Sequence, residues 1–160
     1  MVADGLSFVA VDTVAEAFVG CILACDYRKD TQPDVPVPKE VEPISALLNA
    51  LEVPFEAQRS IEYGQVLKVD IAVVTQAMQG KGVYTRMREH VHACGIEEGY
   101  ASVVGELSSQ ATQALCVGRF KHHVHSEIVY RDFEFEGRHP FASITSPPSV
   151  QLVEGLFPKA

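Results

Sequence analysis

The stretch 73–84 has the residue types and the spacing of a site for a phosphate-bearing ligand. An apolar run ends at Val74, and a short polar loop with Gly80 and Gly82 leads from it into a helix. Glycine leaves the backbone N–H groups uncovered, and the helix dipole adds positive potential at the helix start. The loop therefore predicts a site for the pyrophosphate of a nucleotide-like cofactor.

The charge of the chain favours a small ligand over a polymer or a membrane. The chain has 160 residues and a formal net charge of −8, so it repels nucleic acid and anionic lipid, and we expect neither as a partner. Within this acidic chain the loop, Arg86 and Arg88 form a locally basic segment, which indicates a specific anion site. Exposed arginines on a helix are the alternative.

The composition indicates one globular domain that spans residues 1–160, with a hydrophobic fraction of 47%. No apolar run approaches the ~20 residues of a membrane helix, and the N-terminus lacks the pattern of a secretory signal. The four cysteines, at positions 21, 25, 94 and 116, do not have the spacing of zinc ligands, so we expect no metal. Reduced thiols and a cytoplasmic location are the default.

Apolar periodicity predicts the elements that position the loop. Runs at 6–12 and 17–27, joined by a short link, predict an antiparallel hairpin, and the nearly continuous run 66–74 predicts a central strand. A stripe at helical spacing predicts a helix over 43–51. A second stripe, which Gly95 would end, predicts a helix after the loop and consists of Val83, Met87, Val91 and Cys94.

The second half of the chain continues this alternation. Residues 100–107 predict a buried strand, and Ser108 or Ser109 can cap a helix that runs to about Arg119. The runs 127–133 and 141–145 predict a closing hairpin around Glu136-Gly137. The fold class is therefore α/β (α+β), with a mixed central sheet and helices on both faces.

The loop and its context resemble the GNAT superfamily of acetyl-CoA-dependent N-acetyltransferases. The cofactor motif of that family is an apolar strand, a Gln or Arg, and glycines at fixed spacing before a helix, and residues 79–82 (Gln-Gly-Lys-Gly) match it. Tyr84 stands where the family usually carries a further Gly or Ala. The segments 108–115, 127–133 and 137–141 are similar to parts of arylalkylamine-type members.

The resemblance implies a GNAT-like fold, acetyl-CoA as co-substrate and a small primary amine that attacks the thioester directly in a ternary complex. The family usually begins with a strand and one or two helices before the hairpin, and we expect this unit to be missing here. By resemblance, the residues that bind the cofactor are Ala72, Val73, Val74, Gln79, Gly80, Lys81, Gly82, Val83, Tyr84 and Ser109.

Side chains on the helix after residue 107 are the first candidates for proton transfer. Ser108 and Thr112 lie four residues apart, which would place them on one helix face, and they match hydroxyl positions with catalytic roles in insect members of the family. An N-cap serine and a packing threonine are the alternative. Cys116 takes the place of the tyrosine that many members use as the acid, and a buried structural cysteine is the alternative.

Two carboxylates are candidates for the general base. Asp70 lies within the apolar run 66–74, so it is either a site group with a raised pKa or the partner of Lys68 in an ion pair on one strand face. Glu106 on the next strand is the second candidate.

The histidines between the helix and the strand are a third cluster of polar residues. His122, His123 and His125 predict an exposed turn rather than a metal site, although His123 and His125 can share a face.

The function and the oligomeric state each have a second hypothesis. A catalytically weak acyl-CoA-binding module is the alternative to an acetyltransferase. An exposed sheet edge at the first strand predicts that a second copy of the chain could cover it, which would form a homodimer.

Overall fold

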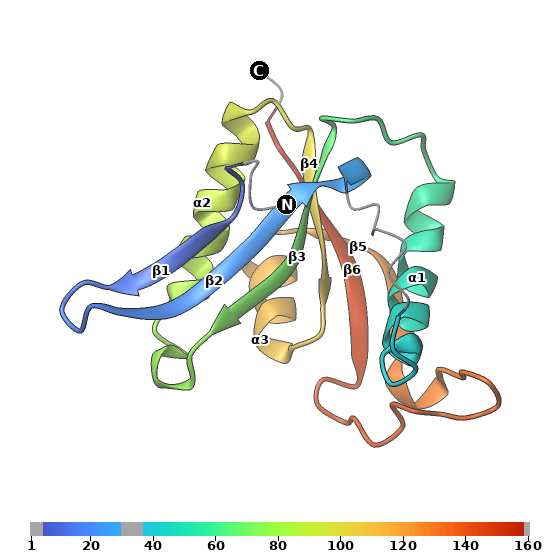
Figure 1. Ribbon diagram of the computed structural model, residues 1–160. Coiled ribbons are helices and arrows are strands. Elements are labelled where there is room, and N and C mark those ends of the chain that lie inside the picture. Colours follow the sequence, from blue (N-terminus) through green and yellow to red (C-terminus); the bar gives the residue numbers. More distant parts are fainter. Residues whose placement is uncertain (1–4, 30–36, 159–160) are drawn as a thin grey trace. The chain divides into compact units, whose positions relative to one another are not determined.

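Six strands form a mixed sheet in this computed structural model, which describes residues 5–29 and 37–158 (Figure 1). Hydrogen bonding places them in the order β1-β2-β3-β4-β6-β5. The strands are β1 (Phe8–Asp12), β2 (Ala17–Asp26), β3 (Val66–Val74), β4 (Ser102–Leu107), β5 (His123–Val129) and β6 (Ser149–Leu156). The helices are α1 (Glu42–Ala57), α2 (Val83–Glu97) and α3 (Gln110–Gln113), which a π-helical segment, Ala114–Arg119, continues. The predicted α/β class with a mixed sheet is confirmed.

The described residues group into two compact units. The first contains residues 5–29, 62–104 and 156–158, and the second contains residues 37–61 and 105–155. The prediction of a single domain stays a prediction. None of the helices in these ranges is long and apolar enough to cross a membrane.

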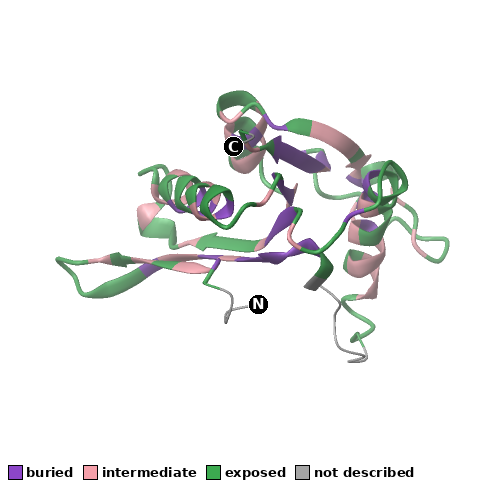
Figure 2. Ribbon diagram, turned by 90° about the horizontal axis from the view of Figure 1, so that it is seen from above, coloured by how far each residue is buried: buried purple, intermediate pink, exposed green. Residues whose placement is uncertain are grey.

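In the first unit, the hairpin at the start of the chain is confirmed. β1 and β2 pair antiparallel. The Asp12 carboxylate accepts hydrogen bonds from the N–H groups of Val14 and Ala15, at 2.9 and 3.0 Å, and so closes the turn between the strands. Exposed residues dominate the turn end of this hairpin (Figure 2).

Helix α2 packs on the β1–β3 strands through the predicted stripe. Met87 and Val91 are buried in an apolar cluster, and Val83 and Cys94 are partly buried against it. The other buried members of this cluster are Leu6, Ile22, Ala24, Leu67, Val69 and Val103. Burial of this stripe fixes the start of α2, and with it the loop, against the sheet.

The end of α2 differs from the prediction. The helix continues past Gly95 and stops before Gly99, which has a φ of +84°. The N–H groups of Gly99 and Tyr100 donate to the carbonyls of Ile96 and Gly95, at 3.1 and 2.9 Å, which is the Schellman arrangement. Gly95 serves close packing instead, because a Cβ there would lie 2.7 Å from Phe157 Cε2.

In the second unit, α1 is longer than the predicted helix over 43–51. It runs from Glu42 to Ala57 and buries Leu47, Leu51 and Phe55 at a spacing of four residues. Pro54 lies inside the helix and has no N–H to donate, so it removes one hydrogen bond from the last turns. The helix continues because tertiary packing of Phe55, which is 1% exposed, outweighs that loss.

The closing hairpin also pairs different segments from those predicted. β5 and β6 pair antiparallel, so the strand over 127–133 begins earlier, and the partner expected at 141–145 is not a strand. The predicted partner forms turns because its aromatic side chain packs elsewhere. The Phe141 ring stacks on Phe133 with centroids 5.8 Å apart and contacts Tyr130 edge-on at 6.1 Å.

The connection between β5 and β6 has a local structure of its own. The predicted turn at residues 136–137 is confirmed, with φ of +49° and +74°, and it closes a bridge between Phe135 and Arg138. At the base of the connection, the Tyr130 N–H donates to the Pro148 carbonyl at 3.0 Å. The loop is thus closed at both its base and its middle.

Candidate functional site

The C-terminal half of β3 is accessible and leads directly into the glycine loop. Residues 66–69 are buried, whereas Ile71 and Val73 are 51% and 55% exposed. On the β2 side, Ala72 pairs with Ile22, and Val74 with Gly20. The predicted cofactor-binding residues 72–74 therefore lie at an exposed strand end beside the loop.

Two glycines set the shape of the loop. Gly80 and Gly82 have φ of +73° and +76°, in the left-handed region that favours glycine. A Cβ added at either position would meet no atom within 4 Å, so the requirement comes from the backbone and not from crowding. Gln79, Gly80, Lys81 and Gly82 are all exposed, so the backbone of the loop is open to solvent.

The start of α2 supplies N–H groups and a positive dipole. Gly82 is the N-cap residue and has no side chain that could cap the helix. The first N–H groups of a helix have no acceptor within it, so this end is suited to an anion. Val83 and Tyr84 are partly buried against the apolar cluster of α2, so their side chains anchor the loop and the ring of Tyr84 points inward.

Lys81 adds a positive charge to the loop. Its Nζ lies 3.7 Å from Met78 Sδ. The sulfur of methionine is neutral, so this weak contact does not cancel the charge of the lysine. The pKa of Asp12 is held below its ordinary value by the hydrogen bonds from the Ala15 and Val14 N–H groups and, to a smaller extent, by the charge of Lys81. The positive charge of the loop at Lys81 is therefore felt at the acidic turn between β1 and β2.

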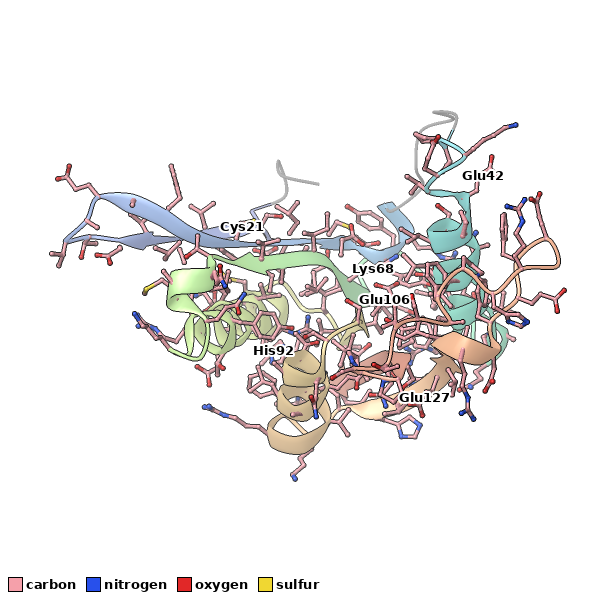
Figure 3. All side chains as sticks on the ribbon, turned by 90° about the horizontal axis from the view of Figure 1, so that it is seen from below. Cys21, Glu42, Lys68, His92, Glu106 and Glu127 are labelled. Atoms are coloured by element: carbon pink, nitrogen blue, oxygen red, sulfur yellow. The ribbon has the colours of Figure 1, made fainter. Side chains whose placement is uncertain are left out.

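Asp70 pairs with a lysine. Asp70 Oδ1 lies 3.6 Å from Lys68 Nζ, and Oδ2 lies 3.9 Å from Cys25 Sγ. The Lys68 and Asp70 side chains are 9% and 14% exposed, and Lys68 Nζ lies 5.7 Å from the centre of the Tyr27 ring (Figure 3 labels Lys68 on β3). This pairing supports the structural alternative for Asp70 over the role of general base.

Ser109, not Ser108, caps the helix after β4. Ser109 Oγ accepts a hydrogen bond from the Thr112 N–H at 3.2 Å and lies 2.9 Å from Thr112 Oγ1. The Thr112 hydroxyl also donates to the Ser109 carbonyl at 2.9 Å. Since α3 begins at Gln110, Ser108 lies before the helix, and the prediction that Ser108 and Thr112 share a helix face is wrong.

The four cysteines are free thiols, and two of them lie in apolar surroundings. Cys116 is 0% exposed in a cluster with Leu107 and Val153, which supports its structural alternative over a role as acid. Burial raises the pKa of Cys94, and the nearby Glu97 and Glu98 raise it further. Cys94 is therefore a weak nucleophile at neutral pH.

The histidine segment is not the exposed turn that was predicted. His122 is 6% exposed, and His125 lies on β5. His123 and His125 do share a face, with ring centroids 4.8 Å apart. Residues 5–29 and 37–158 contain no group of three or more side chains arranged to hold a metal ion.

A buried carboxylate, Glu154, escaped the sequence analysis. It is 5% exposed, forms an ion pair with Arg59, and its Oε2 lies 2.8 Å from His125 Nε2. Arg59 also lies over the Phe55 ring, 4.7 Å from its centre. This cluster connects the end of α1 to β5 and β6. The available signal was an acidic residue within the apolar run 149–156.

Gln113 is a second residue that the sequence analysis did not single out. Its Nε2 donates to the Leu107 carbonyl at 3.0 Å and to the Ser149 carbonyl at 2.9 Å. The end of β4 and the start of β6 are therefore joined by one side chain on α3. A glutamine on a short helix carries no sequence signal for such a role.

The two arginines of the basic segment have different environments. Arg86 is exposed, in accord with the alternative of an arginine on a helix surface. Arg88 is 0% exposed and is the largest fully buried side chain of the described residues. His92, labelled on α2 in Figure 3, accepts a hydrogen bond from Arg88 Nε at 3.2 Å.

The fold matches solved structures, although no family model and no curated protein matches the sequence. The C-terminal condensation domain of Ebony, in complex with beta-alanyl-dopamine, overlaps with a TM-score of 0.84 at 18% identity, over 95% of this chain and 72% of that chain. The mosquito protein named arylalkylamine N-acetyltransferase like 5b overlaps with a TM-score of 0.77 at 20% identity, over 98% of this chain and 76% of that one.

A third match is the Drosophila melanogaster polyamine N-acetyltransferase that forms N-acetylagmatine. Its TM-score is 0.74 at 21% identity, over 98% of this chain and 77% of that one. These overlaps cover nearly the whole of the present chain. They confirm the predicted GNAT-like fold.

Proposed function

From this GNAT fold we propose that the protein is an N-acetyltransferase that transfers the acetyl group of acetyl-CoA to a small primary amine. The glycine loop at the start of α2 carries the proposal, because its exposed backbone and left-handed Gly80 and Gly82 suit a diphosphate. Neighbours of this fold named as arylalkylamine and polyamine N-acetyltransferases support the reaction and the class of acceptor.

The exposed groups of the loop and of β3 support binding of acetyl-CoA. The backbone N–H groups of residues 79–84 would bind the pyrophosphate, and Lys81 would add a charge-assisted contact. The exposed strand residues 72–74 would bind the pantetheine arm as if it were another strand. No metal takes part in this proposal.

The reaction needs orientation more than strong catalytic groups. Acetyl-CoA supplies an activated thioester: the amine nitrogen bonds to the carbonyl carbon, the C–S bond breaks, and one amine proton ends on the departing sulfur. A backbone N–H of residues 72–74 would polarise the carbonyl. Proton transfer falls to side chains, and Thr112 is the candidate whose hydroxyl the structure holds in a defined position.

Turnover distinguishes this proposal from a catalytically weak acyl-CoA-binding module. CoA release is measured with a thiol-reactive dye in the presence of acetyl-CoA and a panel of arylalkylamines, agmatine and polyamines. We expect release that depends on both substrates. Calorimetric binding of acetyl-CoA without release for any amine would favour the binding module. A protein that binds no acetyl-CoA would overturn both.

Thr112→Val tests the hydroxyl on α3. The substitution keeps the β-branched shape and removes the Oγ1 that bonds Ser109. We expect kcat to fall by about a hundredfold with the acetyl-CoA Kd unchanged, since a proton-transfer group acts in the transition state. Thr112→Ser, which keeps the hydroxyl, is the control. Unchanged rates for Thr112→Val and for Ser108→Ala would return both residues to structural roles.

We extend the proposal to a cytoplasmic homodimer. The four free cysteines support a reducing compartment. Large apolar residues on the first two strands support a second copy as partner, because Val9 and Phe18 are 61% and 73% exposed.

A further inference from the structure

Glu127 on β5 is an exposed carboxylate that neighbouring side chains hold in place, although no positive charge compensates it. Its Oε1 accepts hydrogen bonds from the Ser149 hydroxyl and from Gln151 Nε2, the latter at 3.2 Å (Glu127 is labelled in Figure 3). Within residues 5–29 and 37–158, no lysine, arginine or histidine pairs with this carboxylate. Its other oxygen, Oε2, accepts no hydrogen bond from these residues, so it is available to a ligand.

Ser149 makes this carboxylate more rigid than an ordinary surface glutamate. Ser149 is 3% exposed, and its carbonyl accepts a hydrogen bond from Gln113 Nε2 at 2.9 Å. A glutamate side chain that is free in solvent loses rotamer entropy when it binds a ligand, whereas one that two donors already hold loses less. The Glu127 carboxylate is therefore oriented before a ligand arrives.

Gln151 adds a second acceptor beside the carboxylate. Its Nε2 donates to Glu127, while its Oε1 is shielded from water and has no hydrogen-bond partner among the described residues. A buried amide oxygen without a donor destabilises the folded chain. Because the neighbouring Glu127 side chain is exposed, it can shift to admit a donor. An anionic acceptor and a neutral one side by side suit a cationic group with several N–H donors, and both an ammonium and a guanidinium have this chemistry.

We propose that Glu127, together with Gln151, binds a second cationic group of the acceptor, so that the substrate is an amine with another ammonium or a guanidinium at its far end. The inference rests on the proposed function and names the substrate class for it. A carboxylate beside the reacting nitrogen would favour its protonated form, which has no lone pair for the attack. Glu127 therefore suits the end of the substrate that does not react.

Contacts within the second unit connect this site to the proposed proton-transfer hydroxyl. Gln113 follows Thr112 on α3, and its Nε2 donates to the carbonyls of Leu107 and Ser149, at 3.0 and 2.9 Å. The Ser149 hydroxyl in turn donates to Glu127. The two ends of a short dication would thus meet groups whose positions are set by one hydrogen-bonded chain.

Steady-state kinetics with two amines of the same carbon chain test the proposal, because putrescine has a second ammonium and butylamine has none. We expect the wild type to have the higher kcat/KM for putrescine. Glu127→Gln should lower that value about tenfold to a hundredfold, mainly through KM, and should change the value for butylamine less than about threefold. Glu134→Gln, which removes the same charge from an exposed position of the β5–β6 connection, is the control and should leave both values unchanged.

The pattern of the loss decides between roles for Glu127. Equal losses of kcat/KM for the two amines would assign it to the reacting nitrogen or to packing and overturn the proposal. Unchanged kinetics in Glu127→Gln would overturn it as well. Both results leave the proposed function intact, because acetyl transfer to amines would still be observed.

Calorimetric titration of putrescine in the presence of CoA separates binding from turnover. We expect Glu127→Gln to weaken putrescine binding at least about tenfold, and Gln151→Leu, which removes the amide, to weaken it in the same direction. Putrescine that binds through Glu127 without acetyl transfer to any amine would overturn the proposed function and retain the cation site. A wild type that binds putrescine no better than butylamine would overturn the cation site.

Discussion

Gly82→Asp is expected to abolish acetyl-CoA binding while the protein stays folded. An aspartate carboxylate at the N-cap of α2 would lie where the pyrophosphate is proposed to bind. Two unit charges 4 Å apart repel by about 4 kcal/mol at an effective dielectric constant of 20, which corresponds to about a thousandfold in affinity. Calorimetry or ligand-induced stabilisation measures the loss.

The fold should tolerate this substitution. An added side chain meets no atom within 4 Å at Gly82, and aspartate is among the residues that accept a positive φ. Aspartate is also a favourable N-cap residue, so it offsets part of the backbone strain. Gly82→Asn is the matched control, with the same shape and no charge, and should keep most of the affinity. If both variants bound acetyl-CoA like the wild type, the loop would not be the binding site.

Glu154→Ala should be the most destabilising single change at a polar residue of the second unit. It removes a carboxylate that is 5% exposed and that bonds both Arg59 and His125. Charge-assisted bonds and the cavity left behind together predict a loss of about 3 kcal/mol in the free energy of unfolding. This expected loss lies at the lower end of the range for removing one partner of a buried ion pair, because the Arg59 side chain is 38% exposed and can be hydrated once Glu154 is gone. Urea unfolding measures it.

Glu127→Ala provides the comparison for this prediction. Glu127 lies on the neighbouring strand β5 and also accepts two hydrogen bonds, from Ser149 and Gln151, but it is exposed. A surface carboxylate of this kind is worth about 1 kcal/mol or less. Equal losses for the two variants would mean that burial of the Glu154 cluster adds nothing to stability.

Elements in which apolar residues recur at a regular spacing, or form an unbroken run, could be predicted from the sequence. β3 has the predicted bounds, because a nearly continuous apolar run rich in β-branched residues has few other solutions. The stripe of α2 was equally clear, but its end was not. Both Gly95 and Gly99 suit a helix terminus locally, and only the packing of Phe157 against Gly95 decides between them.

The closing hairpin shows the limit of local patterns. Residues 141–145 are apolar and β-prone, yet the ring of Phe141 is taken up by Phe133 in a loop. β6 instead contains the charged Glu154, whose burial becomes acceptable only through Arg59 on a distant part of the chain. Propensity cannot register a partner that is remote in sequence.

In the candidate site, too, features encoded by a few neighbouring residues could be predicted, and features that depend on distant contacts or on the exact cap position could not. The glycine loop could be predicted because positive φ and an uncapped helix start are encoded within a few residues. The hydroxyl arrangement could not, because one shift in the cap position, from Ser108 to Ser109, changes which side chain meets Thr112. The burial of Arg88 depends on tertiary packing, so its sequence neighbours gave no sign of it.

The closed base of the β5–β6 connection has a consequence for variation. The Tyr130–Pro148 hydrogen bond separates the strands from everything between them, and the bridge at Phe135 and Arg138 supports the outer part independently. Insertions or deletions at the 136–137 turn can therefore alter the length and chemistry of this loop without changing the strand register. Such a loop can diversify, or carry a reporter tag, while the rest of the molecule stays as it is.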